Sequence, residues 1–386
     1  MGLQITESSL GRNDLLLEEK IQLNSIVRQR SVDSMREPGS QLAFPVSICV
    51  LNYNGGSEFR QTLGELVRLT DPNIAEFVVI DDGSTDGGAE WAEETHPEVR
   101  VVRLDHNEGL ISVVRNAALR ESKSRYVMMM DNDIRIDLQC ISELMKVMVS
   151  YDDVLCCTPR VVDIHNTSKI YGDGGKLHFL CLAAGSSRGR TVSSSEIRPP
   201  PRPTIGTGIM LIDKELSARI GDFDEGFVIG SSDGEYHFRG RIAGYNVLQV
   251  PAATIGHLAR PHGKSRAFGQ LYNRYRMLLI VYSGRTLILL SPALILFEIL
   301  LTIGSIPGGF FGLRNRAVAR LFRERRDIRR RRLEVQALRT RPDSAVLCAD
   351  SLSVLGRGEK VAVLRFGAAM LNGMSRVYWR LVRRWL

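Results

Sequence analysis

The sequence lacks the cysteine patterns that hold metal ions or cross-link a secreted fold. Its six cysteines, at positions 49, 140, 156, 157, 181 and 348, show no metal-ligand spacing and no pairing pattern. Cys156 and Cys157 are adjacent, and Cys49 lies inside an apolar run that indicates a strand. We therefore expect six reduced thiols, as in a cytosolic protein.

Two further absences exclude other classes of protein. Residues 1–40 carry mixed charge without an apolar core segment, so they are not a secretory signal. We expect residues 1–43 to form a polar arm with one helix at about 14–28. The stretch Gly263-Lys-Ser265 resembles the end of a phosphate-binding P-loop, but Leu258 stands where that motif needs its first glycine. A P-loop nucleotide site is therefore excluded.

Positive and negative charges nearly balance along the chain except in one segment. The chain has a net charge of +8, and residues 314–341 contain twelve arginines. Without this segment the protein would be near neutral. Such a local excess suits either anionic lipid or nucleic acid. The segment lacks the interleaved aromatics of a single-strand binder. We therefore expect an anionic membrane surface as its partner and no nucleic acid.

The length of 386 residues accommodates a catalytic domain of ordinary size with an accessory region. Strand patterns at 44–51, 75–80, 100–104, 125–131 and 154–158 alternate with helical patterns such as 57–69 and 138–150. This alternation predicts an α/β fold with a parallel sheet. Residues 164–203, rich in Ser, Arg and Pro, are expected to form an irregular, mobile surface loop.

Acidic and polar residues follow several of these strands. Asp81-Asp82 follows the second, and Asp131-Asn132-Asp133 follows the fourth. Parallel strands bring their carboxyl ends to one edge, where open α/β sheets bind ligands. Closely spaced carboxylates there suit a divalent cation, and the cation suits a phosphate. The alternative is that these residues only form Asx turns.

The chain also resembles the large family 2 of inverting glycosyltransferases, which have the GT-A nucleotide-sugar-binding fold. The resemblance covers Val46 to about His257. It rests on motifs that occur in the family's order: Asn52-Tyr53-Asn54, Asp81-Asp-Gly-Ser-Thr-Asp86, Asn107-x-Gly109, Arg115-Asn116, Asp131-Asn132-Asp133, Gly206-x-Gly-x-Met-Leu211, Gly221-x-Phe-Asp-Glu225, Asp233-x-Glu235, Arg239, Gly244-Tyr245 and His257.

This resemblance implies three groups of site residues. It implies that Asp82 binds the nucleoside of a nucleotide-diphosphate sugar, with Asn54 and Arg115 as helpers. The other expected donor-site residues are Asn52, Asp131 and Asn132. Asp131, Asp133 and His257 are the expected ligands of Mg²⁺ or Mn²⁺, which stabilises the leaving diphosphate. Asp233 is the expected general base, which takes the proton of the acceptor hydroxyl.

The chain departs from the family pattern near this base. Ser232 stands where an acidic residue is usual, and Glu235 replaces the commoner Asp. Phe227 and Tyr236 are the nearest candidates for an aromatic beside the base. Alternatives remain for single residues: Asp233 and Glu235 would also suit the first turn of an ordinary helix, and His257 would also suit a buried position.

The expected organisation is a polar arm (1–43), a GT-A glycosyltransferase domain (44–265) and a hydrophobic, arginine-rich helical region that associates with a membrane (266–386). Residues 286–306 have the length of a membrane span, but they include Pro292 and Glu298. A single crossing would place the arginines outside the cell, against the positive-inside tendency. We therefore favour helices lying in the cytoplasmic leaflet. A single span and a buried soluble helix are the alternatives.

Together these features predict an inverting, metal-dependent glycosyltransferase at the cytoplasmic face of the cell membrane. It would move a sugar from a nucleotide-diphosphate donor to a hydroxyl of a glycan or lipid-linked acceptor. The alternative is a non-catalytic scaffold that binds a nucleotide sugar in a membrane complex for glycan assembly.

Overall fold

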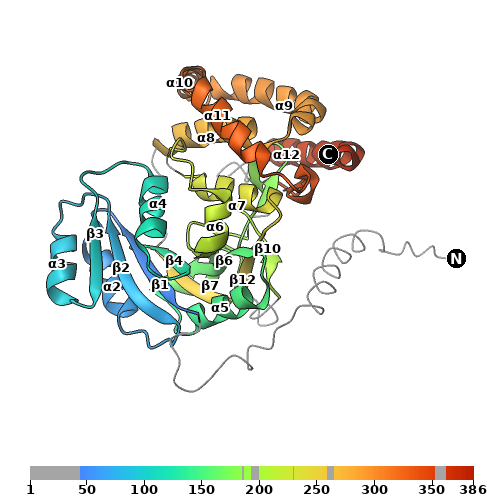
Figure 1. Ribbon diagram of the computed structural model, residues 1–386. Coiled ribbons are helices and arrows are strands. Elements are labelled where there is room, and N and C mark those ends of the chain that lie inside the picture. The colour runs from blue at the N-terminus through green and yellow to red at the C-terminus, as the bar shows by residue number, and fades with distance from the viewer. Residues whose placement is uncertain (1–43, 185–186, 193–199, 229, 259–264, 353–361) are drawn as a thin grey trace.

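The computed structural model describes residues 44–184, 187–192, 200–228, 230–258, 265–352 and 362–386. The arm predicted at 1–43 and its helix lie outside the described residues. A sheet with helices on both faces forms one part of the molecule, and a layer of C-terminal helices lies beside it (Figure 1).

One half of the sheet is parallel, as predicted. β1 (Val46–Asn52) lies between β2 (Ile74–Asp81) and β4 (Tyr126–Asp131), and β3 (Val99–Arg103) lies beyond β2. All three pairings are parallel. β1 is buried along its whole length, as its continuous apolar sequence requires. The carboxyl ends of these strands therefore meet at one edge.

The other half of the sheet mixes strand directions. β11 (Met210–Asp213) runs antiparallel between β4 and β6 (Val154–Asp163), and β12 (Asn246–His257) runs parallel to β6. β5 (Ile134–Ile136) pairs antiparallel with the end of β12, so Ile134 lies opposite His257. This pairing brings the Asp131–Asp133 turn next to a histidine more than a hundred residues later in the chain.

Helices cover both faces of the sheet because alternate residues of its strands point to opposite sides. Ile48 and Val50 pack in one core with α2 (Gly56–Leu66), α3 (Gly88–Thr95) and α5 (Cys140–Ser150). Cys49 and Leu51 pack in the other core, with α4 (Ile111–Glu121), α6 (Lys214–Ile220) and α7 (Ser232–Ile242). The mixed, mainly parallel α/β class is thus confirmed.

The prediction of an irregular loop at 164–203 is wrong for about half of its described residues, which lie in strands. β7 (Asn166–Gly172) pairs with β6, β10 (Arg202–Pro203) pairs with β12, and β8 (Lys176–His178) pairs with β9 (Leu182–Ala184). β8 also pairs with β13 (Leu347–Cys348), far along the chain. Such short strands depend on distant partners more than on local propensity. Residues 185–186 and 193–199 lie outside the described part.

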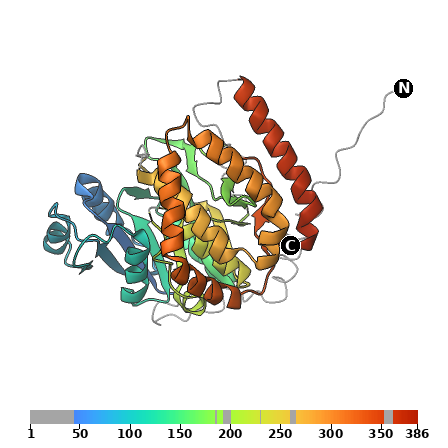
Figure 2. The same ribbon diagram turned by 90° about the horizontal axis from the view of Figure 1, so that it is seen from above.

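The C-terminal helices form a layer on the far side of α6 and α7 from the sheet, as Figures 1 and 2 show. They are α8 (Ser265–Val281), α9 (Gly284–Ser305), α10 (Phe311–Arg323), α11 (Arg325–Ala337) and α12 (Ala362–Val382). One hydrophobic core joins this layer to the sheet domain, and in it the rings of Phe238 (α7) and Tyr282 stack at 5.8 Å.

A buried cluster of charges also joins the two parts. Arg276 on α8 is fully buried and donates to both oxygens of Asp224, at 3.1 and 2.8 Å, and to Asp327 on α11 at 2.6 Å. The pKa of Arg276 is raised: burial opposes its charge, but Asp224 and Asp327 outweigh the burial. Asp224 belongs to the loop between α6 and α7, so Arg276 fixes that loop against the C-terminal layer.

We predict that Arg276→Ala destabilises the protein by about 3–5 kcal/mol, because it leaves Asp224 buried without its charged partner. The measurement is the midpoint and slope of urea unfolding. Arg330→Ala is the matched control, since Arg330 is exposed and its ion pairs with Asp327 and Glu334 lie on the surface of α11. This control should unfold like the wild type. Equal stability of all three proteins would contradict a structural role for the buried cluster.

Candidate functional site

The polar ends of three adjacent parallel strands are joined by one amide side chain. The Asn52 side chain, at the end of β1, donates to Asp81 Oδ1 at 2.8 Å and to Ser84 Oγ at 3.2 Å. Its oxygen accepts a hydrogen bond from the Asn132 amide at 2.8 Å. The turns after β2 and β4 are therefore neighbours in space, as predicted.

Asp81 and Asp82 have different surroundings although they are adjacent. Asp81 accepts from the Ser84 backbone N–H at 2.9 Å as well as from Asn52, which is the Asx-turn arrangement. Asp82 accepts only from the backbone N–H of Glu108, at 3.2 Å. Its pKa is raised, chiefly by burial. Asp81 therefore forms an Asx turn, which was the alternative considered from the sequence. Asp82 instead borders a hollow.

This first hollow has a volume of about 540 Å³ and lies at the carboxyl ends of β1, β2 and β4. Its walls combine apolar and polar side chains, which suits a ring with hydrogen-bonding edges. The lining includes Leu51, Asn52, Tyr53, Asp82, Asn107, Gly109, Val114, Asp131, Asn132, Asp133, Tyr171 and His257.

Asp131, Asp133 and His257 converge at one side of this hollow. His257 Nε2 lies 3.4 Å from an oxygen of each carboxylate, and one potential ligand atom from each residue lies within 4.8 Å of the others. Burial disfavours the charged imidazole, but the bond to Asp131 and both carboxylate charges outweigh it and raise the pKa of His257. The pKa of Asp131 is lowered because the bond to His257 outweighs burial.

The chemistry of this trio fits a divalent cation. Two carboxylates and one imidazole offer the oxygen and nitrogen ligands that Mg²⁺ and Mn²⁺ accept. The Nδ1 atom of His257 lies 2.9 Å from the Leu258 carbonyl oxygen, which leaves Nε2 directed at the carboxylates. Tyr171 stacks on the imidazole, with the ring centres 4.9 Å apart. The ring is therefore held in orientation from two sides.

A second hollow, of about 770 Å³, adjoins the first and contains Asp233 in its wall. Ile111, Asp131, Tyr171 and His257 line both hollows. The second one extends from these residues to α8, and its lining also includes Arg115, Gly175, Lys176, Leu177, Leu182, Ile205, Gly208, Gly234, Gln270, Asn273, Arg274 and Met277.

Asp233 and Glu235 differ sharply, although both lie in the first turn of α7. Glu235 is fully buried, and both its oxygens accept from Arg239, at 2.8 and 3.0 Å. Arg239 in turn binds backbone carbonyls at residues 220–222, so Glu235 stabilises that turn of the chain. Asp233 is half-buried and borders the second hollow, where it can meet a ligand.

Arg115 lies on the second hollow and not on the first. It donates to the buried Ser232 hydroxyl at 3.0 Å, and its guanidinium lies 5.5 Å from the centre of the Phe223 ring. Gly208 permits this position, because a Cβ there would lie 2.7 Å from the Arg115 side chain. Arg115 is therefore placed beside Asp233, away from Asp82, and Ser232 has a specific partner.

Asn54 lies outside the linings of both hollows. Its backbone has a positive φ of 46°, and its side-chain oxygen accepts from the Thr85 N–H at 2.8 Å. Asn54 thus fastens the turn after β1 to the turn after β2. Of the donor-site residues expected from sequence, Asn52, Asp82, Asp131 and Asn132 border the first hollow.

Two residues of the site were missed by sequence reasoning. Tyr171 belongs to a segment expected to be irregular, and only the β6–β7 pairing reveals its place. Asn273 on α8 bonds with the backbone of Val228 and Gly230, just before Asp233. Its position within a helix of the presumed accessory region gave no signal. Neither Phe227 nor Tyr236, the aromatic candidates, borders the second hollow, because both are buried in cores.

Part of this chain is similar to known proteins. Residues 47–217 match the model of glycosyl transferase family 2. Glycosyltransferase GlyA of Streptococcus pneumoniae serotype 4 is 30% identical over 107 residues, which are 28% of this chain and 15% of that protein. N-acetylgalactosaminyltransferase 7 of Mus musculus is 24% identical over 237 residues, which are 56% of this chain and 36% of that protein.

A solved structure has the same fold. The crystal structure of GalNAc-T7 with UDP, GalNAc and Mn²⁺ aligns with a TM-score of 0.51 at 20% identity, covering 61% of this chain and 48% of that one. The match covers only 15% of the length of GlyA and 36% of the length of N-acetylgalactosaminyltransferase 7. The matched residues hold β1, β2, β4 and β11 with the turns between them. Residues 47–217 therefore form a domain of glycosyl transferase family 2.

Proposed function

We propose that the protein transfers a sugar, with inversion, from a nucleotide-diphosphate donor to a hydroxyl of a glycan or lipid-linked acceptor. The observation that carries this proposal is the junction of the two hollows at Asp131 and His257. A donor in the first hollow would present its sugar at that junction. An acceptor in the second would approach it from the side of Asp233.

In the first hollow, Asp82 would accept hydrogen bonds from the nucleoside, and Asn52 and Asn132 would hold the strand-end turns around it. Asp131, Asp133 and His257 would bind Mg²⁺ or Mn²⁺ beside the diphosphate. A cation bound there would stabilise the negative charge that develops on the leaving nucleoside diphosphate. The solved structure with the same fold holds UDP and Mn²⁺, which supports testing these two first.

In the second hollow, Asp233 would act as the general base. An acceptor hydroxyl has a very high pKa, so its proton must be removed as the new bond forms. The acceptor oxygen attacks the anomeric carbon, its proton passes to Asp233, and the bond from that carbon to the diphosphate oxygen breaks. Glu235 cannot share this role because Arg239 occupies both its oxygens inside the protein.

The surroundings of the second hollow support the proposed acceptor and location. Leu177, Leu182 and Met277 give part of its wall an apolar surface, and α8 continues from this wall toward α9. α9 is long and apolar enough to meet a membrane. This supports a lipid-linked acceptor at the cytoplasmic face of the cell membrane.

A non-catalytic scaffold that binds a nucleotide sugar is the second candidate. The carboxylate-based site fits both functions up to the binding of the donor. The two differ only in whether Asp233 performs proton transfer, so a single substitution separates them.

We predict that a nucleotide sugar raises the melting temperature of the full chain in the presence of Mn²⁺, because it binds the folded state only. UDP-, GDP- and dTDP-sugars are compared in a thermal-shift panel, with and without the metal. Failure of every nucleotide sugar in the panel would contradict both the enzyme and the scaffold.

We predict that Asp233→Asn lowers the transfer rate by about 10²–10⁴-fold, since an amide cannot take the acceptor's proton. Binding of the nucleotide sugar, followed by thermal shift, should be unchanged. Asp222→Asn is the control, since Asp222 is an exposed carboxylate near the other end of the same loop. Wild-type protein that transfers no sugar from any donor, while binding it, would favour the scaffold.

We predict that His257→Ala weakens Mn²⁺ binding by more than about tenfold, because it removes a nitrogen ligand directed at both carboxylates. Titration calorimetry of the metal alone, with no donor present, measures this loss. His106→Ala is the control, because the His106 side chain is 72% exposed on a loop outside the trio. Unchanged affinity in His257→Ala would remove this histidine from the metal site.

A further inference from the structure

α9 has one exposed apolar face along most of its length. Its large apolar side chains recur every three or four residues on this face and are 46–74% exposed: Ile288, Ile295, Leu296, Ile299, Leu300 and Ile303. Side chains at this spacing share one side of a helix. Exposed apolar patches of such extent mark an interaction surface.

The opposite side of α9 is packed against the protein. Leu287, Leu294 and Phe297 contact the hydrophobic core that joins the helical layer to the sheet domain. Glu298 is held by Arg274 of α8 and by the Tyr275 hydroxyl at 2.8 Å, and Arg314 of α10 lies 3.3 Å away. The only carboxylate within α9 is thus neutralised by the two neighbouring helices.

α12 carries a similar exposed stripe next to α9. Met370, Met374, Val377 and Leu381 are 53–61% exposed at helical spacing. The Tyr378 hydroxyl of this helix donates to the Leu289 carbonyl of α9 at 2.5 Å. Ile288 of α9 and Trp385, in the short turn after α12, line one hollow, so the end of this stripe lies beside α9.

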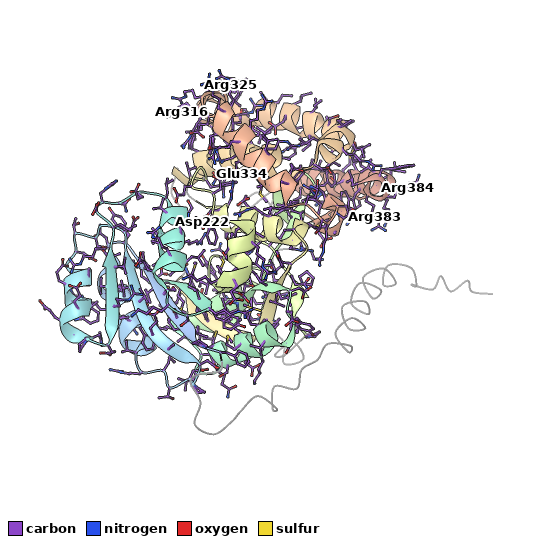
Figure 3. All side chains as sticks on the ribbon, viewed as in Figure 1. Asp222, Arg316, Arg325, Glu334, Arg383 and Arg384 are labelled. Atoms are coloured by element: carbon purple, nitrogen blue, oxygen red, sulfur yellow. The ribbon has the colours of Figure 1, made fainter. Side chains whose placement is uncertain are left out.

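The arginines of the C-terminal region fall into two groups. Arg332 and Arg339 are half-buried and donate to backbone carbonyls at the end of α8, so part of the arginine-rich segment stabilises the fold. The expectation that the whole segment faces lipid is therefore too broad. Other arginines are exposed at the outer ends of the layer, and Figure 3 shows Arg316 and Arg325 at one end and Arg383 and Arg384 at the other.

We propose that the exposed faces of α9 and α12, with these outer arginines, dock the protein on an anionic lipid bilayer while α9 lies in the plane of the membrane. This set of residues is the docking face. Amphipathic helices bind bilayers through buried apolar side chains and basic residues at the headgroups. The last 27 residues contain no Asp or Glu, so this end of the chain suits a negatively charged surface.

Glu298 favours docking in the plane over a crossing. α9 is long enough to span a bilayer, but crossing would carry Glu298 into the hydrocarbon, where an ionised carboxylate is costly. It would also separate Glu298 from Arg274 and Arg314, which belong to helices packed on the protein body. In the plane, the apolar face enters the lipid while Glu298 keeps its partners.

α8 connects the docking face to the proposed catalytic side. On α8, Asn273 bonds with the backbone before Asp233, and the adjacent Arg274 pairs with Glu298 of α9. Lipid binding requires neither donor nor acceptor, so the docking face stands or falls separately from the proposed transfer reaction.

The first test is flotation of the full chain with vesicles of phosphatidylcholine, with and without phosphatidylglycerol. Wild-type protein should float with the anionic vesicles, and binding should weaken as salt is raised. The double variants Ile299→Asp/Ile303→Asp and Arg383→Glu/Arg384→Glu should each bind more than about tenfold more weakly. Their melting temperatures and thermal shifts with nucleotide sugar should match the wild type.

Matched controls lie on the sheet domain. Leu138→Asp replaces a side chain that is 75% exposed between β5 and α5, and Arg68→Glu reverses an exposed charge beyond α2. Both should float like the wild type. Equal loss in controls and variants, or no loss in the variants, would overturn the docking face. Light scattering would also overturn it if the wild type were a dimer and only the Ile299→Asp/Ile303→Asp variant were a monomer. The face would then bind a second copy of the chain.

The second test distinguishes docking in the plane from a crossing. Arg285→Cys places a thiol in the first turn of α9, and Arg316→Cys places one in α10, beyond the end of α9. Wild-type protein gives the background from its own cysteines, of which Cys348 alone is partly exposed among the six. In sealed inverted membrane vesicles, a membrane-impermeant maleimide should label both variants without detergent. Labelling of one variant only, with the other requiring detergent, would show that α9 crosses and would overturn the proposal.

Discussion

The site depends on a hydrogen-bonded chain from Asp81 through Asn52 to Asn132, which joins the ends of three adjacent parallel strands. Asn52 can do this because an amide both donates and accepts, so it satisfies a carboxylate on one side and another amide on the other. Its side chain is buried at 2% exposure, where an unpaired amide would be costly. The two acidic turns are therefore fixed in position before any ligand arrives.

A second constraint comes from α8. Over five successive residues, from Tyr272 to Arg276, its side chains reach the junction of α10 and α11, the loop before Asp233, α9, and the Asp224 loop. Successive helix residues point in different directions, so one short segment can contact several partners. The C-terminal layer thus acts as part of the sheet domain's support, although sequence reasoning treated it as an accessory region. Arg276 and Asn273 are the residues that reveal this.

The trio of Asp131, Asp133 and His257 shows how far sequence reasoning extended and where it ended. The turn holding Asp131 and Asp133 follows from an apolar strand and its polar end, which are local features. His257 was assigned by family resemblance, and its position was set by pairing between β5 and β12. Tyr171, which orients the imidazole, could not be found, because its strand exists only through pairing with β6. Arg115 was expected near Asp82 but lies near Asp233, since Ser232 accepts its hydrogen bond.

The sequence by itself determined the first four strands and β6, the parallel half of the sheet and the acidic ends of its strands. These depend on apolar runs and turn residues close together in the chain. Only the tertiary structure decided which carboxylates border a hollow: Asp82 but not Asp81, and Asp233 but not Glu235. It also decided which arginines are internal and which are exposed. The physical reason is that burial and charge pairing are set by residues distant in sequence, and a local pattern carries no record of them.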